Sequence, residues 1–392
     1  MATNPSRAYN DPAGGTPSNI GTQLNTFFYQ KQALIEKRTE QVFMQIADVT
    51  QLPKHFGKKI KRFHYIPLLD DANVNNQGID AGGATIANGN LYGSSRDIGT
   101  ISGKLPALTE FGGRVNRVGF KRKELEGSIE KFGFFEEYTQ ESLDFDTDAE
   151  LEMHINREML NGAYKMTEDA LAIDILTSAG VVKYAGSATS TVTIDETSII
   201  SYGDIMRLNI DLDNNRTPKQ TTMITGTRNV DTRVIPSARV AYMASELLPT
   251  VKAMKDLHNN PAFIAVERYA AGTTVLNFEA GSIDQTRIVI VPEMVRWEGA
   301  GKTTADATIY TTAGKADVFP FLIVGEKSFT TIGFQTSGKT VKFVVYHKKP
   351  GEANADRSDP YGEQGFMSIK WYYGFMALRP ERIGLIKTAA KL

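Results

Sequence analysis

The chain has 392 residues, with 44 Lys and Arg against 45 Asp and Glu, 41% hydrophobic residues and no cysteine. This composition is typical of a globular protein, and the length allows about two to three domains. The lack of cysteine excludes disulfides, thiolate metal sites and a cysteine nucleophile. A net charge of −1 argues against nucleic-acid binding through bulk charge. A polar start and the lack of a long apolar run predict a soluble chain without an export signal or membrane span.

The first 70 residues predict an arm, a helix and a strand. Residues 1–25 are polar and rich in Gly, Pro, Asn and Thr, which indicates a mobile arm. Apolar residues in 26–50 recur at loosely helical spacing, and Pro53 would end that helix. Residues 58–70 alternate basic with apolar side chains and therefore predict a strand.

A glycine-rich segment follows this strand. Nine glycines lie between residues 78 and 113, among few large apolar side chains. Such a segment cannot build a core of its own, because glycine loses the most entropy on folding and buries little surface. Residues 114–120 alternate again as a second strand. The two strands predict an extended hairpin, or flap, and loops of this length usually contact a partner or serve function.

The next predicted element is a very long acidic helix over 147–179. Thr147 and Glu150 form a capping box, and Gly180 supplies the stop. At ~1.5 Å per residue the helix would be a rod of roughly 45 Å. Residues 136–183 carry 12 acidic and 3 basic side chains, whereas residues 1–135 carry 12 acidic and 17 basic. This asymmetry indicates either a solvated acidic face or contact between like molecules through opposite charges.

The rest of the chain alternates helix and strand signals, which together with the earlier elements predicts an α+β fold without internal repeats. The predicted elements are a helix from the capping box 201–204 to 213–215, a helix over 240–254, a buried strand over 287–292, an apolar segment over 319–324, a strand pair formed by 328–334 and 341–347, and an aromatic-rich block over 367–378.

One motif invites an enzymatic interpretation. Residues 333–340 match the phosphate-binding pattern G-x-x-x-x-G-K-T. That chemistry requires a helix after the motif, whereas residues 341–346 are β-branched and alternating. Residues 336–339 are therefore predicted to be a hairpin turn. The five histidines are scattered and no nucleophile motif is present, so we predict no catalytic residue, no cofactor and no metal site.

The order of arm, glycine-rich flap, long acidic helix and α+β body resembles the major capsid proteins of tailed phages with the Hong Kong 97-type fold, in the branch of the N-four-like podoviruses. The resemblance covers about residues 25–390. The stretches that carry it are 57–63, 128–146, 281–292, 324–329, and 359–365 with Lys370 and Trp371.

The resemblance implies a structural subunit, not an enzyme, that self-assembles into the icosahedral shell around phage DNA. It implies that the shell is assembled in the bacterial cytoplasm and that the subunit is located in the virion. It implies the following division: an N-terminal arm (1–56), an extended loop with its flanks (57–135), a peripheral domain with the spine helix 147–179 (136–199), an axial domain (200–329) and a return to the peripheral sheet (330–392). Two alternatives are an encapsulin-like compartment shell and, in a different class, a P-loop nucleotide hydrolase.

The implied partners are copies of the chain itself, as hexamers and pentamers, together with portal protein, a separate scaffolding protein, decoration proteins and weak, sequence-independent contact with DNA. No membrane contact is implied. Candidate contact residues in the extended loop are Gly82, Gly83, Gly89, Gly93, Gly99, Lys104, Gly112 and Gly113. An inner basic patch would comprise Lys54, Lys58, Lys59, Lys61 and Arg62.

Overall fold

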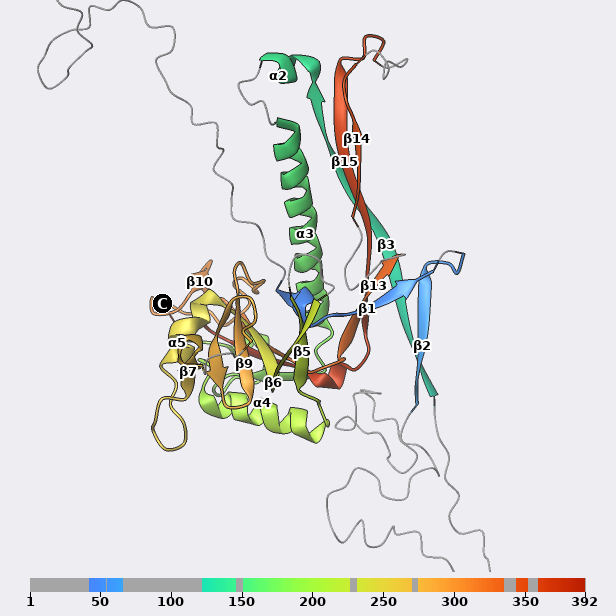
Figure 1. Ribbon diagram of the computed structural model, residues 1–392. Coiled ribbons are helices and arrows are strands. Elements are labelled where there is room, and N and C mark those ends of the chain that lie inside the picture. Colours follow the sequence, from blue (N-terminus) through green and yellow to red (C-terminus); the bar gives the residue numbers. More distant parts are fainter. Residues whose placement is uncertain are drawn as a thin grey trace, which may run out of the picture.

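A computed structural model gives the fold, which is built from two β-sheets and one long helix (Figure 1). It describes residues 42–53, 55–65, 122–145, 151–225, 231–269, 274–334, 343–351 and 359–391. In one part of the molecule a helix runs beside long strands, and the other part is compact. No helix among these residues is long and apolar enough to cross a membrane.

The first sheet has six strands in the order β1-β13-β15-β3-β2, with β14 paired to β15. Its strands are β1 (Asp48–Leu52), β2 (Lys59–Tyr65), β3 (Arg122–Thr139), β13 (Phe329–Phe334), β14 (Val344–Lys348) and β15 (Gln364–Ala377). The short helix α2 (Gln140–Phe145) follows β3 directly. β3 and β15 form the longest ladder, antiparallel from Ser128↔Phe375 to Thr139↔Gln364.

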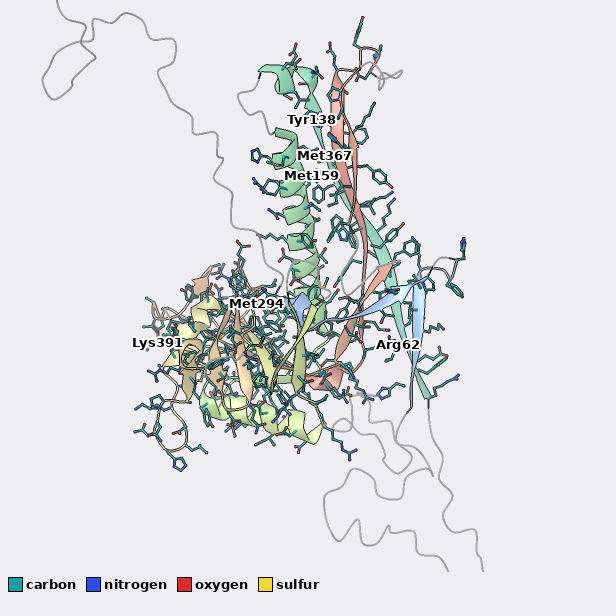
Figure 2. The ribbon with its side chains drawn as sticks, in the orientation of Figure 1. Arg62, Tyr138, Met159, Met294, Met367 and Lys391 are labelled. Atoms are coloured by element: carbon teal, nitrogen blue, oxygen red, sulfur yellow. The ribbon has the colours of Figure 1, made fainter. Side chains whose placement is uncertain are left out.

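The long helix α3 (Leu151–Thr177) covers one face of this sheet. Burial alternates along β15, and its inward side chains Met367, Ile369 and Trp371 join the same core as Met159 of α3. Figure 2 shows Met159 and Met367 between the helix and the strands. The predicted long helix is thus confirmed over 151–177, whereas its predicted capping box lies outside the described residues.

The second sheet has eight strands in the order β4-β16-β12-β6-β9-β8-β7, with β5 paired to β6. Its strands are β4 (Val181–Tyr184), β5 (Gln220–Thr225), β6 (Asp231–Ala244), β7 (Phe263–Ala265), β8 (Glu279–Ile283), β9 (Thr286–Val291), β12 (Phe319–Val324) and β16 (Ile383–Thr388). All six residues of β12 are buried, because neighbours cover both of its edges and both of its faces. The strand predicted over 287–292 is confirmed as β9.

Two further helices and several short elements complete the fold. α4 (Tyr202–Asn214) begins at the predicted capping box: Asp204 N donates to Ser201 Oγ at 3.3 Å, and Ser201 N donates to Asp204 Oδ2 at 3.0 Å. The others are η1 (Phe43–Gln45), η2 (Thr191–Thr193), η3 (Ser245–Leu247), α5 (Leu248–Lys252), η4 (Val266–Arg268), β10 (Thr311–Thr312), β11 (Lys315–Ala316) and η6 (Pro380–Arg382).

The helix predicted over 240–254 is wrong in its first half. Residues 240–244 belong to β6, between β12 on one edge and β9 on the other, and each is at most 1% exposed. A short apolar run that is buried on all sides is compatible with either a helix or a strand. Here hydrogen bonding to β12 and β9 makes it a strand. The α-helical part is limited to α5.

Three other predictions need correction. The described end of the helix predicted over 26–50 is a 3-10 turn followed by β1, which pairs in parallel with β13, so residues 42–52 belong to the body rather than to a free arm. The predicted strand pair of 328–334 and 341–347 consists of two real strands, β13 and β14, but each pairs with β15. Within the predicted return over 330–392, β13, β14 and β15 lie in the sheet that α3 covers, whereas β16 pairs with β12 and β4 and lies in the eight-stranded sheet.

The ladder between β3 and β15 depends on a glycine. A Cβ placed on Gly374 would lie 2.2 Å from the carbonyl oxygen of Ser128. We therefore expect Gly374→Ala to lower the free energy of unfolding by about 1–3 kcal/mol, because backbone must move to make room. Gly203→Ala is the matched control, since its Cβ would meet nothing closer than Ser201 Oγ at 3.7 Å, and it should be neutral or slightly stabilising. Urea denaturation of both variants measures the difference, and equal stabilities would contradict the packing.

Candidate functional site

β2 and β3 hold the two ends of the segment predicted to be a flap. They pair antiparallel, from Lys59↔Ser128 to Tyr65↔Arg122, and residues 66–121 connect them. The first predicted strand, 58–70, is confirmed over 59–65, and its observed partner is β3, which begins at Arg122. The strand predicted over 114–120 lies outside the described residues, as do Gly82, Gly83, Gly89, Gly93, Gly99, Lys104, Gly112 and Gly113.

The base of this hairpin carries a ladder of opposite charges. Lys59 Nζ lies 2.5 Å from Glu126 Oε1, and Lys61 Nζ lies 3.2 Å from Glu124 Oε2. The hydrogen bond and the charge of Lys59 lower the pKa of the Glu126 carboxyl. All four side chains are substantially exposed, so the pairs add little stability, but the glutamates offset the charges of Lys59 and Lys61.

The predicted basic patch is therefore only partly assembled. Lys59 and Lys61 face glutamates of β3, and Arg62 donates to Thr50 Oγ1 on β1 at 2.8 Å. Figure 2 shows Arg62 on β2, away from α3. Lys58 precedes β2 and is exposed, and Lys54 lies outside the described residues. Binding of DNA through this patch stays a prediction.

Exposed aromatic side chains mark the sheet face that α3 does not cover. The ladder places Tyr346 opposite Ser368 and Ser368 opposite Phe135, so the two aromatic residues share one face. Phe135 is 63% exposed and Tyr346 is 51% exposed, with Lys370 Nζ 4.4 Å from the Tyr346 ring centre. Because aromatic residues are enriched in the buried cores of protein–protein interfaces, this face is a candidate contact surface.

A similar ring lies at the hairpin base. Phe63 on β2 is 50% exposed, and the Arg122 guanidinium lies 4.1 Å from its ring centre. It shares one strand face with Lys61 and Lys59, two and four residues earlier. This face combines an apolar ring with paired charges, which suits a polar contact between proteins.

The described residues do not assemble a catalytic constellation. No group of three or more His, Asp or Glu side chains among them could hold a metal ion. Two surface cavities, of about 350 and 510 Å³, are lined by Pro236, Tyr269 and Arg287 among others, and by Ile199, Pro249 and Met254 among others.

The phosphate-binding interpretation of 333–340 gains no support from the fold. β13 ends at Phe334, residues 335–342 lie outside the described residues, and the next described element is the strand β14. The strand predicted over 341–346 is confirmed for residues 344–346. The neighbouring described element is thus a strand, where phosphate binding by this motif needs a helix.

Two buried carboxylates were not singled out by the sequence. Glu279 of β8 accepts from Arg287 of β9, and the two side chains are 0% and 5% exposed. Glu168, in the middle of α3, is 8% exposed and accepts from the backbone N–H groups of Phe43 and Met44. A charged residue at a single helix or strand position gives no signal of burial, so only the packed fold reveals them.

Comparisons with known proteins match this architecture to one family. The family model described as phage capsid protein matches residues 122–388. The major capsid protein of Pseudomonas phage KPP21 is 64% identical over 386 residues, covering 98% of this chain and 97% of the relative. The chain belongs to the phage capsid protein family. It is a structural subunit of the phage head, located in the virion capsid.

Solved structures show that this capsid protein also shares the family's fold. The capsid of Ralstonia phage GP4 aligns with a TM-score of 0.62 at 11% identity, over 100% of this chain and 99% of that one. The capsid of cyanophage Pam1 aligns with a TM-score of 0.59 at 12% identity, over 95% and 98%. The predicted α+β phage-capsid fold of Hong Kong 97 type is therefore confirmed, and neither the encapsulin-like nor the hydrolase alternative gains support.

Proposed function

We propose that this capsid protein forms its shell through hexamers and pentamers, with the segment 66–121 lying over an adjacent subunit. The observation that carries this proposal is the 64% identity to a major capsid protein over 98% of the chain. The hairpin base formed by β2 and β3 supports it further, because a glycine-rich segment leaving a sheet needs a surface elsewhere on which to bury itself. Head-to-tail contacts that close by symmetry produce such rings.

The domain division follows from the two sheets. We propose that the six-stranded sheet with α3 forms the peripheral domain and that the eight-stranded sheet with α4 forms the axial domain. Residues 42–52 and β16 then belong to these domains rather than to an arm and a peripheral return. The exposed face around Phe135 and Tyr346 is a proposed contact surface within the shell.

The further partners are proposals as well. We propose that the subunit contacts the portal protein, a separate scaffolding protein and decoration proteins. We also propose that it belongs to the N-four-like branch of the family. Contact with packaged DNA would be weak and independent of sequence, because Lys59 and Lys61 are paired with glutamates. We propose no enzymatic step for the chain.

A test of this function uses the suspected phosphate-binding lysine as the discriminating position. The full chain, expressed with the other head genes of its phage, should sediment as large closed particles. Lys339→Ala should assemble to the same extent, because we assign Lys339, which lies outside the described residues, no part in shell closure. We also expect the unmodified chain and Lys339→Ala to show the same ATP hydrolysis, at the background rate measured without protein. Nucleotide turnover that disappears with Lys339→Ala would contradict the structural interpretation and favour the hydrolase.

A further inference from the structure

The turn η1 is fastened to the body by a buried carboxylate. Phe43 N donates to Glu168 Oε2 at 2.9 Å, and Met44 N donates to Glu168 Oε1 at 3.3 Å. These two N–H groups lie in a single 3-10 turn and have no partner in a regular ladder, so the two oxygens of the Glu168 carboxyl group accept from them. One side chain of α3 thereby holds the first described residues of the chain to the body.

Other elements hold the same segment in place. The rings of Phe43 and Tyr242 of β6 have centroids 4.5 Å apart, and Tyr242 Oη donates to the carbonyl oxygen of Val42 at 3.3 Å. Gln45 Oε1 accepts from Asn277 N at 3.1 Å. After Ala47 the chain enters β1 of the other sheet, so residues 42–47 connect both sheets and the long helix.

The charges around Glu168 do not compensate a carboxylate. Asp169 on α3 is acidic, and the hydroxyls of Tyr242 on β6 and Tyr373 on β15 lie within its electrostatic reach. Tyr373 already donates to Asp174, and Lys165, one turn earlier on α3, pairs with Glu293. Among the described residues, only neutral backbone N–H groups stabilise the charge of Glu168.

Burial without a cation favours the neutral acid. Desolvation raises the pKa of Glu168 from 4.5 to about 7, although the backbone hydrogen bonds act in the opposite direction. We propose that Glu168 is a proton-controlled latch: with its proton bound it holds residues 42–47 on α3, and loss of the proton loosens that segment while the rest of the fold stays closed.

The sign of the pH dependence follows from linkage. When the segment opens, Glu168 meets water and its pKa returns to the ordinary value, so the open state holds fewer protons than the closed one between pH 4.5 and about 7. The equilibrium constant for opening therefore rises by about tenfold per pH unit in this window and becomes constant above it. The whole change is on the order of a hundredfold. Below pH 4.5 both states are protonated and the latch is fully closed.

Hydrogen–deuterium exchange of the full chain from pH 4.5 to 8.5, corrected for the intrinsic exchange rate, measures this opening. Peptides covering residues 42–47 should lose protection across the window, whereas β12 should keep its protection. Glu168→Gln should make the opening independent of pH, since the amide has no proton to lose. Glu158→Gln, an exposed carboxylate on the same helix, should retain the wild-type slope.

Two outcomes would overturn the latch. One is a flat profile for residues 42–47 in the wild-type chain, a result that needs no variant to fold. The other is an unchanged slope in Glu168→Gln, which would assign the titration to another group. Both readouts concern the lone subunit, so they are independent of whether the chain assembles.

Discussion

Removing residues 78–113 is expected to abolish particle formation while leaving a folded subunit. β2 and β3 are antiparallel neighbours, and residues 66–77 and 114–121 would still join them after the deletion. Such a connection is ample for an antiparallel pair, because hairpin loops need only about 2–5 residues. Both hydrophobic sheets and α3 are otherwise untouched. The free energy of unfolding should therefore change little, whereas the contact that we propose with the adjacent copy is lost.

Sedimentation and electron microscopy measure assembly of this deletion, and circular dichroism with urea denaturation measures the fold. A second variant replaces residues 78–113 by a Gly/Ser linker of the same length, which keeps the chain length but removes the side chains. We expect this variant to fail in assembly as well. Wild-type particles from the deletion would show that the segment is not needed for assembly. Wild-type particles from the linker variant would show that it acts only as a spacer.

Glu279→Ala should cause one of the largest losses of stability in the chain, about 3–5 kcal/mol. The Glu279 carboxylate accepts from Arg287 Nε at 2.7 Å and from Arg287 Nη2 at 2.8 Å. It also accepts from Tyr269 Oη at 2.9 Å and from Leu276 N at 2.8 Å. Its removal leaves a guanidinium that is 5% exposed without its anion, and it leaves the buried backbone N–H of Leu276 without its acceptor.

The matched control is Glu298→Ala. Glu298 pairs with Arg296 at 3.2 Å, but the two side chains are 59% and 32% exposed, so water replaces the lost partner. We expect a change below about 1 kcal/mol. Urea denaturation of the lone subunit compares the two variants. Similar losses for both would show that burial of the Arg287–Glu279 pair does not decide its contribution.

The elements that the sequence predicted well carry strong local signals. The capping box at Ser201 and Asp204 defines the start of α4 through two hydrogen bonds between neighbours in the chain. The apolar runs of β9 and β12 fit strands that neighbours cover, and an uninterrupted helical stretch predicts α3. In each case the information lies within a few residues, so the chain itself is sufficient.

The elements that the sequence missed depend on partners far along the chain. Residues 240–244 become a strand because β12 and β9 supply both hydrogen-bonding edges, about 45–80 residues away. β13 and β14 each pair with β15 and not with one another. Local sequence does not determine this pairing, because the partner strand lies further along the chain. The same limit applies to the candidate site. The lysines of β2 are visible as a basic run, but their neutralisation requires the pairing with Glu124 and Glu126 on β3.

We propose that residues 78–113 of this chain become buried only against a sister copy in a closed shell. Electron cryomicroscopy of the particles formed by the full chain with its own head genes tests this most directly. The account predicts an icosahedral shell in which density for residues 78–113 lies on the neighbouring subunit. A discrete monomer in which that segment packs against its own sheets would contradict it.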